Sequence, residues 1–221
     1  MSQTHQDTLA LDAAERRQID RKSLMLRSAK VVCHSGEYIC LIRDVSELGT
    51  SLSFLHDAPP EPRIILALTN GLTFPIERIW AGKRQAGYRF ASPVSLDEFL
   101  HENTPFALRP IRLNLEASAR IIDGRFSHTA RLLDLSCHGA KIECDGVIQK
   151  SRLIGFQAEG MTQQLGEIVW CDEASVPFRY GLQFQHPIEL KSLAETALRL
   201  QPFGAPERDD LGKALGKASA A

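Results

Sequence analysis

The chain has 221 residues, of which 43% are hydrophobic and 24% are charged, as is usual for a globular protein. Its formal net charge of -1 and isoelectric point of about 6.7 argue against a protein that coats nucleic acid by bulk electrostatics. Its apolar runs are shorter than the roughly 18 residues that span a bilayer, and no secretory signal precedes the five cysteines. We therefore expect reduced cysteines, a cytoplasmic location and no membrane span.

The first candidate element is the basic segment "LALDAAERRQIDRKSLM" (residues 9–25), which contains neither Gly nor Pro. It is compatible with a helix or with a flexible lead-in to the first strand. In a helix, Arg17 and Arg21 lie four residues apart on one face, and each guanidinium can donate two parallel hydrogen bonds to a phosphate. The alternative is a solvated face on which these arginines pair with Glu15 and Asp20.

Short strands bounded by Gly, Pro, Asn or Ser follow this segment, with little helix between them. Their apolar positions tend to alternate, which favours strands with one face on a core. This spacing predicts a small antiparallel barrel or sandwich. The predicted strands are "SAKVVCH", "EYICLIRDVS", "GTSLSFL", "RIILALT", "LTFPIERIWA" and "AGYRFAS" (residues 28–34, 37–46, 49–55, 63–69, 72–81 and 86–92). A capping-box pattern, Ser95 with Glu98, then predicts a short helix in "SLDEFL".

An internal repeat organises the chain. "LIRDVSELGTSLSF" (41–54) recurs as "RLLDLSCHGAKIEC" (131–144), and the same offset of 90 residues carries Trp80 onto Trp170. The sequence thus predicts a mainly β protein with two tandem small antiparallel β-barrels, each followed by a short helix.

The predicted domains are 12–101 and 106–200, with a disordered tail at 201–221. Pro187 is expected to open the helix that closes the second domain.

The repeated turn carries a DxSxxG pattern, made of Asp44, Ser46 and Gly49 in the first copy. A carboxylate accepts from the N1 and N2 donors of guanine, a serine hydroxyl can donate or accept, and glycine allows a tight turn beside a ligand. Acceptors for guanine and upstream arginines for phosphate together indicate a guanine nucleotide. The alternative is a structural turn in which Asp and Ser bond the backbone.

The ordered pair of RxxxR (Arg17 and Arg21) and DxSxxG inside a short-stranded barrel resembles the PilZ domain, the bacterial receptor for cyclic di-GMP. The resemblance covers nearly all of the chain as two tandem copies. It implies that Arg17 and Arg21 clamp the ligand, with Arg16 as an auxiliary candidate. It also implies that the Asp and Ser of the turn read a guanine and that Gly49 forms the turn.

The second copy departs from this pattern. Arg112 lies 22 residues before Asp134 and corresponds to Arg21, but Leu108 occupies the position of the first clamp arginine. Arg109 is present at a spacing of three, with Pro110 after it. We therefore predict a degenerate second site that keeps Asp134, Ser136 and Gly139 as a structural turn, together with Arg109 and Arg112.

Other side chains invite different interpretations. Trp80 and Trp170 lie in apolar strand patterns and are predicted to fill the cores. Cys33-His34 and Cys137-His138 suggest metal ligands, but their spacing does not fit a zinc site, so no metal is expected. We also find no GxSxG, HExxH or phosphate-binding Gly-rich loop, and expect no enzyme activity.

The resemblance therefore implies a non-enzymatic, cyclic di-GMP-binding effector that signals to an unidentified protein partner. Its output would lie in motility, chemotaxis, exopolysaccharide production or pilus function. One alternative is a degenerate PilZ-type interaction module that does not bind nucleotide. Another is an RNA-binding small barrel, although the aromatic content of 7% shows no stacking platform, and no DNA or RNA partner is expected. We expect cyclic di-GMP as ligand without a further cofactor, and the oligomeric state stays open.

Overall fold

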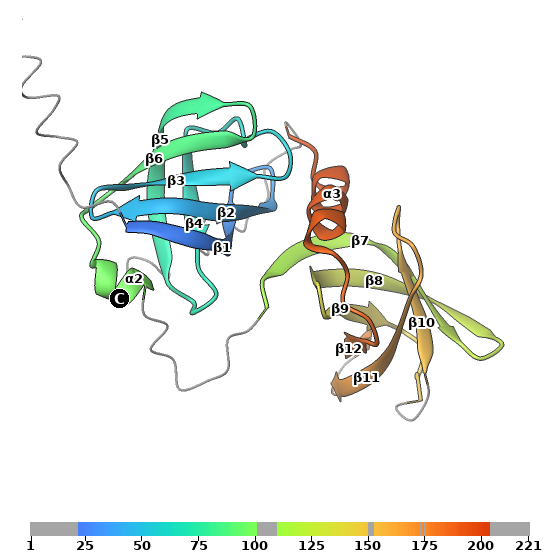
Figure 1. Ribbon diagram of the computed structural model, residues 1–221. Coiled ribbons are helices and arrows are strands. Elements are labelled where there is room, and N and C mark those ends of the chain that lie inside the picture. Colours follow the sequence, from blue (N-terminus) through green and yellow to red (C-terminus); the bar gives the residue numbers. More distant parts are fainter. Residues whose placement is uncertain (1–21, 101–109, 150–152, 173, 175, 204–221) are drawn as a thin grey trace, which may run out of the picture.

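The computed structural model describes residues 22–100, 110–149, 153–172, 174 and 176–203. These residues form two closed six-stranded antiparallel barrels and two short helices (Figure 1). The predicted fold class, tandem small β-barrels each followed by a helix, is confirmed.

The first barrel has the strand order β1-β2-β3-β6-β5-β4. Its helix, α2, spans Leu96–Leu100, and the backbone N–H of Glu98 donates to the Ser95 hydroxyl over 3.4 Å, as the capping box predicts. The strands are β1 (Lys22–Val32), β2 (Glu37–Ser46), β3 (Gly49–Phe54), β4 (Arg63–Ala67), β5 (Thr73–Gly82) and β6 (Gln85–Phe90).

The second barrel repeats this arrangement in the order β10-β11-β12-β9-β8-β7. Helix α3 (Leu190–Leu200) follows it, and begins three residues after Pro187 rather than at that proline. The strands are β7 (Arg112–Asp123), β8 (Phe126–Ser136), β9 (Gly139–Cys144), β10 (Ile154–Ala158), β11 (Gln164–Asp172) and β12 (Phe178–Phe184).

The internal repeat extends to irregularities of the hydrogen-bond ladder. The β2–β3 register shifts between Ile42 and Asp44, and the β8–β9 register shifts between Leu132 and Asp134, 90 residues further on. The β5–β6 pair and the β11–β12 pair carry matching shifts just before Trp80 and Trp170. Because a bulge redirects the side chains that follow it, the two barrels aim corresponding residues in corresponding directions.

The start of β1 differs from the sequence-based expectation. Strand pairing begins at Lys22, opposite Val45, whereas the pattern placed the first strand at residues 28–34 and left residues 22–25 in a helix or lead-in. Pairing with β2 overrides the weak local preference of this segment. The strand therefore reaches the DxSxxG hairpin, and Ser23 lies opposite Asp44 in the ladder.

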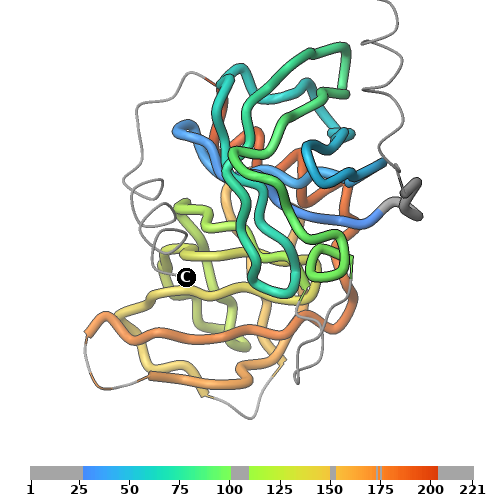
Figure 2. Tube along the Cα trace, turned by 90° about the vertical axis from the view of Figure 1, so that its left-hand side faces the viewer, coloured from blue at the N-terminus to red at the C-terminus, as the bar shows by residue number. Residues whose placement is uncertain are grey.

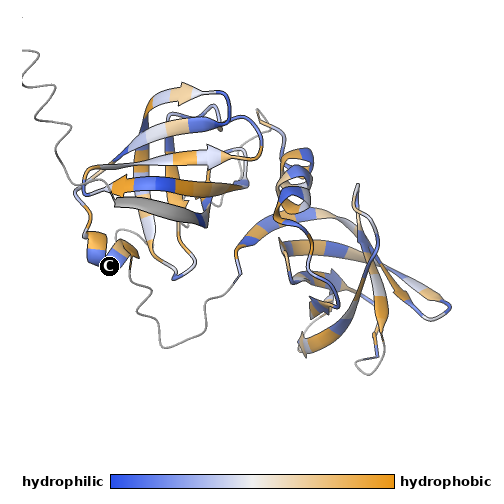
Figure 3. Cartoon of the chain, viewed as in Figure 1, coloured by the Kyte–Doolittle hydropathy of each residue, from blue (hydrophilic) through white to orange (hydrophobic). Residues whose placement is uncertain are grey.

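Each barrel has its own apolar core, and the strands alternate in hydropathy along their length (Figure 3). In the first barrel, Phe99 of α2 is fully buried and its ring lies 5.3 Å from that of Phe74 and 5.9 Å from that of Phe90. The short helix thus closes one end of the barrel with an aromatic side chain.

Helix α3 lies between the barrels and contacts both. Leu193, Ala194 and Ala197 are buried in the core of the second barrel, whereas Leu198 packs against that of the first. In both views the red helix lies beside the blue strands of the first barrel (Figures 1 and 2). The two barrels are therefore joined by packing as well as by the chain.

A buried carboxylate forms the polar centre of this contact. Glu37 of β2 accepts from the Lys30 ammonium over 2.7 Å, and from the backbone N–H and side-chain amide of Asn114, both over 2.8 Å. The Gln201 amide accepts from the Glu37 N–H over 2.7 Å and donates to the Asn114 carbonyl over 2.6 Å. We call these four residues the inter-barrel joint.

The residues directly after α3 also belong to the folded part. Gln201 is only 1% exposed, and its carbonyl accepts from the Tyr38 hydroxyl over 2.6 Å. The ring of Phe203 lies 4.9 Å from that of Tyr38 and 5.6 Å from that of His56. The predicted disordered tail therefore cannot begin at Gln201, while its residues 204–221 lie outside the described part.

We predict that Gln201→Ala lowers the free energy of unfolding by about 1–3 kcal/mol, because it leaves the buried backbone N–H of Glu37 without a partner. Urea unfolding followed by circular dichroism measures this loss. The matched control is Gln157→Ala, since the Gln157 side chain is exposed. Equal unfolding midpoints for the two variants would contradict the role of the joint.

Stability should also fall at acidic pH through His56. Burial lowers the pKa of this imidazole, partly offset by the Asp57 carbonyl and carboxylate, and Arg84 lowers it further. The unfolded chain, with a histidine pKa of about 6.5, then takes up the proton first, so stability is lost as the pH falls below that value.

We expect the stability difference between about pH 7.5 and about pH 5.5 to shrink in His56→Phe. His186→Phe, which replaces an exposed histidine, should keep the pH dependence of the unsubstituted chain. Unchanged pH dependence in His56→Phe would refute this assignment.

Candidate functional site

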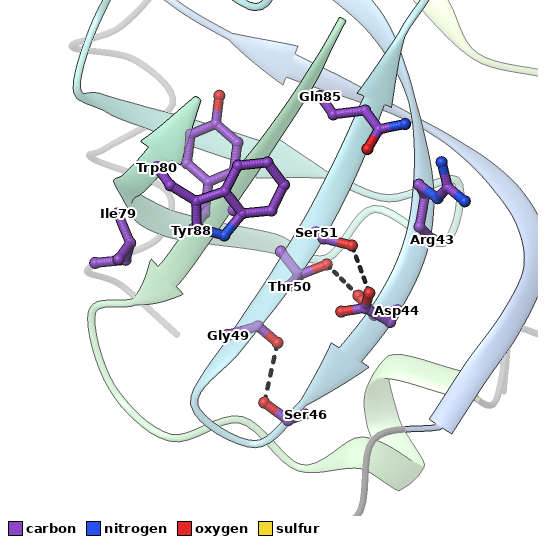
Figure 4. Close-up of a pocket in the computed structure, with 11 residues that line it drawn as sticks. Arg43, Asp44, Ser46, Gly49, Thr50, Ser51, Ile79, Trp80, Gln85 and Tyr88 are labelled. Atoms are coloured by element: carbon purple, nitrogen blue, oxygen red, sulfur yellow. Dashed lines mark hydrogen bonds between the residues drawn. The ribbon is translucent and has the colours of Figure 1, made fainter. Parts of the chain in front are cut away.

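A pocket of about 480 Å³ opens on the first barrel where β2, β3, β5 and β6 meet (Figure 4). Its wall contains all three residues of the first DxSxxG motif, Asp44, Ser46 and Gly49. Trp80 of β5 faces them across the pocket. The structure thus brings the predicted turn residues together at one site.

The turn itself is fixed by a short local hydrogen bond and a close backbone contact. The Ser46 hydroxyl donates to the Gly49 carbonyl over 3.2 Å. A Cβ at Gly49 would lie 2.5 Å from the Tyr88 carbonyl oxygen on β6, so only glycine fits without moving a strand. The hairpin therefore accounts for the glycine by close packing and for the serine by a local hydrogen bond, whatever else they do.

Asp44 is oriented by two hydroxyl groups of β3. Its carboxylate accepts from Ser51 over 2.5 Å, and its carbonyl accepts from Thr50 over 2.7 Å. The bulge at Arg43 precedes it, and the guanidinium of Arg43 lies at the same side of the pocket (Figure 4). A carboxylate and a cation thus stand side by side at the pocket.

The prediction that the tryptophans fill the cores is wrong. Trp80 is 49% exposed and Trp170 is 39% exposed. The register shift places both rings on the outer surface, where each lies on a glycine of the neighbouring strand, Gly87 or Gly181. Hydropathy alone could not reveal this, although the repeated pairing of Trp with a downstream Gly was a visible signal.

The corresponding turn of the second barrel has the same internal bond but different neighbours. The Ser136 hydroxyl donates to the Gly139 carbonyl over 3.1 Å, and accepts from the His138 N–H over 3.3 Å. Lys141 stands where Ser51 stands in the first barrel, opposite the aspartate in the ladder.

Asp134 therefore lies among cations. An oxygen of its carboxylate is 3.7 Å from the Arg112 guanidinium. Burial raises the pKa of this carboxyl, while Arg112, Lys141 and Lys30 of the joint oppose the rise. Arg112, predicted as a remnant of a ligand clamp, is thus engaged by the aspartate of its own barrel.

The remaining predicted ligand residues, Arg16, Arg17, Arg21 and Arg109, lie outside the described residues, as does Leu108. The chain enters β1 at Lys22, whose backbone pairs with Val45. The predicted clamp segment therefore directly precedes a residue, Lys22, that pairs with the neighbour of Asp44.

Other kinds of site find no support in the described ranges. They contain no group of three or more His, Cys, Asp or Glu side chains able to hold a metal ion. Cys33 and Cys40 are buried free thiols, and burial raises the pKa of both. Within the part that the structure describes, no helix has the length and apolar character needed to cross a membrane.

Comparison with known proteins finds a family match for the second barrel only. Residues 108–200 match the PilZ domain family, while no curated protein sequence matches the chain. The matched range contains the second DxSxxG turn, with Asp134, Ser136 and Gly139.

Several solved structures are similar. The Borreliella burgdorferi PlzA protein, solved in complex with c-di-GMP, is 16% identical with a TM-score of 0.32, over 86% of this chain and 98% of that chain. Escherichia coli YcgR, also in complex with c-di-GMP, is 12% identical with a TM-score of 0.33, over 96% and 94%. The Bacillus subtilis inhibitor of motility MotI is 8% identical with a TM-score of 0.36, over 80% and 97%.

The stacking of Trp80 on Gly87 can be tested by filling the glycine. We predict that Gly87→Ala displaces the indole ring and lowers the free energy of unfolding by about 1–3 kcal/mol, since its Cβ would overlap the indole nitrogen. Near-ultraviolet circular dichroism and tryptophan emission, recorded in a Trp170→Phe background, report the ring. Gly82→Ala is the matched control, because its Cβ meets only an ordinary contact at 3.9 Å. The same spectrum and stability in both variants would argue against the contact.

Proposed function

We propose that this chain, whose residues 108–200 belong to the PilZ domain family, is a non-enzymatic cyclic di-GMP receptor that binds its ligand at the first barrel. The observation that carries the proposal is the pocket in which the carboxylate of a DxSxxG turn faces an exposed indole (Figure 4). The family match supports cyclic di-GMP as the ligand, and the pocket supports the first barrel as its binding site.

The pocket offers the two contacts that a guanine needs. The Asp44 carboxylate, held by Ser51, can accept from the N1 and N2 donors of the base. Trp80 presents an aromatic surface, on which a base can stack with a gain of about 1–3 kcal/mol. An edge contact and a face contact from different strands together select a purine with donors on that edge.

The phosphates require cations, and the chain supplies them beside this pocket. Arg43 lines it, and the segment with Arg16, Arg17 and Arg21 immediately precedes β1, whose first residues pair with the Asp44 hairpin. In our proposal Arg17 and Arg21 clamp the phosphates through bidentate hydrogen bonds. Ligand binding would then draw this segment onto the barrel.

The second barrel serves in this proposal as a packing and output surface rather than as a second receptor. Its aspartate is paired with Arg112, and Lys141 replaces the serine that orients Asp44. A ligand there would have to compete with the Arg112 guanidinium, which lies 3.7 Å from the carboxylate. The signal would pass through the inter-barrel joint to a protein partner, with an output in motility, chemotaxis or exopolysaccharide production.

Isothermal titration of the full chain with cyclic di-GMP tests the proposal. We expect binding that weakens roughly hundredfold in Arg17→Ala, which loses a bidentate charged contact, and about ten- to hundredfold in Asp44→Asn. Asp134→Asn is the matched variant of the second barrel and should keep the affinity of the unsubstituted chain.

The outcomes distinguish a receptor site on the first barrel from one on the second, and a receptor from a protein that binds no nucleotide. Loss of binding in Asp134→Asn alone would move the receptor site to the second barrel and overturn our placement. No binding by the unsubstituted chain would instead identify a PilZ-type interaction module that does not bind nucleotide. A thermal shift on adding cyclic di-GMP gives an independent readout, since a ligand of the folded state must raise its stability.

A further inference from the structure

A second and larger hollow lies on the first barrel and meets the DxSxxG hairpin only at Leu48 and at Arg89, which pairs with Gly49. It has a volume of about 840 Å³ and runs across the outer side of β4, β5 and β6. Its lining is mainly apolar and includes Leu48, Ile65, Pro75, Phe90 and Pro93. We call it the β4–β6 groove. Leu48 at its wall is 47% exposed, so a large apolar side chain faces solvent there.

Three charged side chains cross the groove as a row. Glu77 lies between two arginines, with Arg89 at 3.0 Å and Arg63 at 3.5 Å. Both arginines keep most of their side-chain surface exposed, 63% and 83% respectively. One carboxylate thus serves two guanidiniums, which leaves the row with a net positive charge. The groove fits an apolar segment that also carries carboxylates.

The end of α3 is anchored next to this groove. The Gln201 side chain lies against Gly36, two residues from His34 in the groove lining. Ser35 donates to Glu61 over 2.7 Å, and Glu61 is two residues before Arg63. Phe203 packs on Tyr38, whose hydroxyl lies 3.0 Å from that of Ser35. The described part of the chain therefore ends, at Phe203, near the Arg63 end of the groove.

We propose that the segment after α3, residues 204–221, docks in the β4–β6 groove of its own barrel. Its first part contains three acidic residues, Glu207, Asp209 and Asp210, and one arginine. Two leucines, Leu211 and Leu215, follow. The acidic residues would pair with Arg63 and Arg89, and the leucines would cover the apolar wall near Leu48. Seven extended residues reach roughly 25 Å, more than the roughly 15 Å width of three strands.

Limited trypsin digestion of the full chain tests the docking. The segment contains three trypsin sites, Arg208, Lys213 and Lys217, and mass spectrometry follows the first cleavage of the intact chain. We expect cleavage at least tenfold slower than in a free synthetic peptide of residues 204–221. Leu48→Asp places a charge on the apolar wall and should bring the rate to that of the peptide. Leu72→Asp is the matched control, since Leu72 is 38% exposed and is absent from the groove lining.

Circular dichroism verifies the fold of each variant. If Leu48→Asp does not fold, Arg89→Glu carries the test at an exposed position and should also speed cleavage. Cleavage of the unsubstituted chain at the rate of the peptide would overturn the proposal. Protection that vanishes on hundredfold dilution would overturn it as well, because it would mean that a second copy fills the groove.

Discussion

The close approach of β3 to β6, and of β9 to β12, is the constraint on which both candidate sites depend. At Gly49 and Gly139 a side chain would collide with a carbonyl of the neighbouring strand, so the hairpin can form only with glycine at that position. The serine three residues earlier then donates to the glycine carbonyl in both barrels. Two of the three motif residues are therefore explained by architecture alone. What distinguishes a receptor from a structural turn must come from the aspartate and its surroundings.

Those surroundings differ in charge between the barrels. Asp44 is oriented by the neutral hydroxyl of Ser51, which leaves the remaining acceptor capacity of the carboxylate for a donor in the pocket. Asp134 instead lies beside Arg112 and Lys141, and its partial burial raises its pKa against their influence. The first turn therefore offers a carboxylate held by a neutral hydroxyl, whereas the second offers one that already lies beside two cations. The family match covers the second barrel, so it bears on the fold of that domain and not on the choice between the two turns.

Much of the fold could be predicted from the sequence because the two copies of the internal repeat can be compared with each other. The 90-residue repeat fixed the number of barrels, and alternation with turn residues indicated six strands in the first copy. The position of the tryptophans could not be predicted, because an apolar strand pattern does not show where a bulge turns a ring outward. The inter-barrel joint could not be predicted either, because Glu37 bonds to Asn114 and Gln201, which are 77 and 164 residues away in the sequence. Such pairings depend on how two finished barrels pack, which local pattern does not encode.

The joint also links the barrels in a way that apolar packing would not. Burying the Glu37 carboxylate costs desolvation energy, which its bonds to Lys30 within the barrel and to Asn114 across the joint offset. Lys30 bonds to that carboxylate and also to the carbonyl of Arg112, whose guanidinium reaches Asp134. A continuous series of polar contacts thus runs from β2 of the first barrel to the turn of the second. Any change in the angle between the barrels must break or lengthen one of these bonds, which makes the relative orientation discrete rather than freely variable.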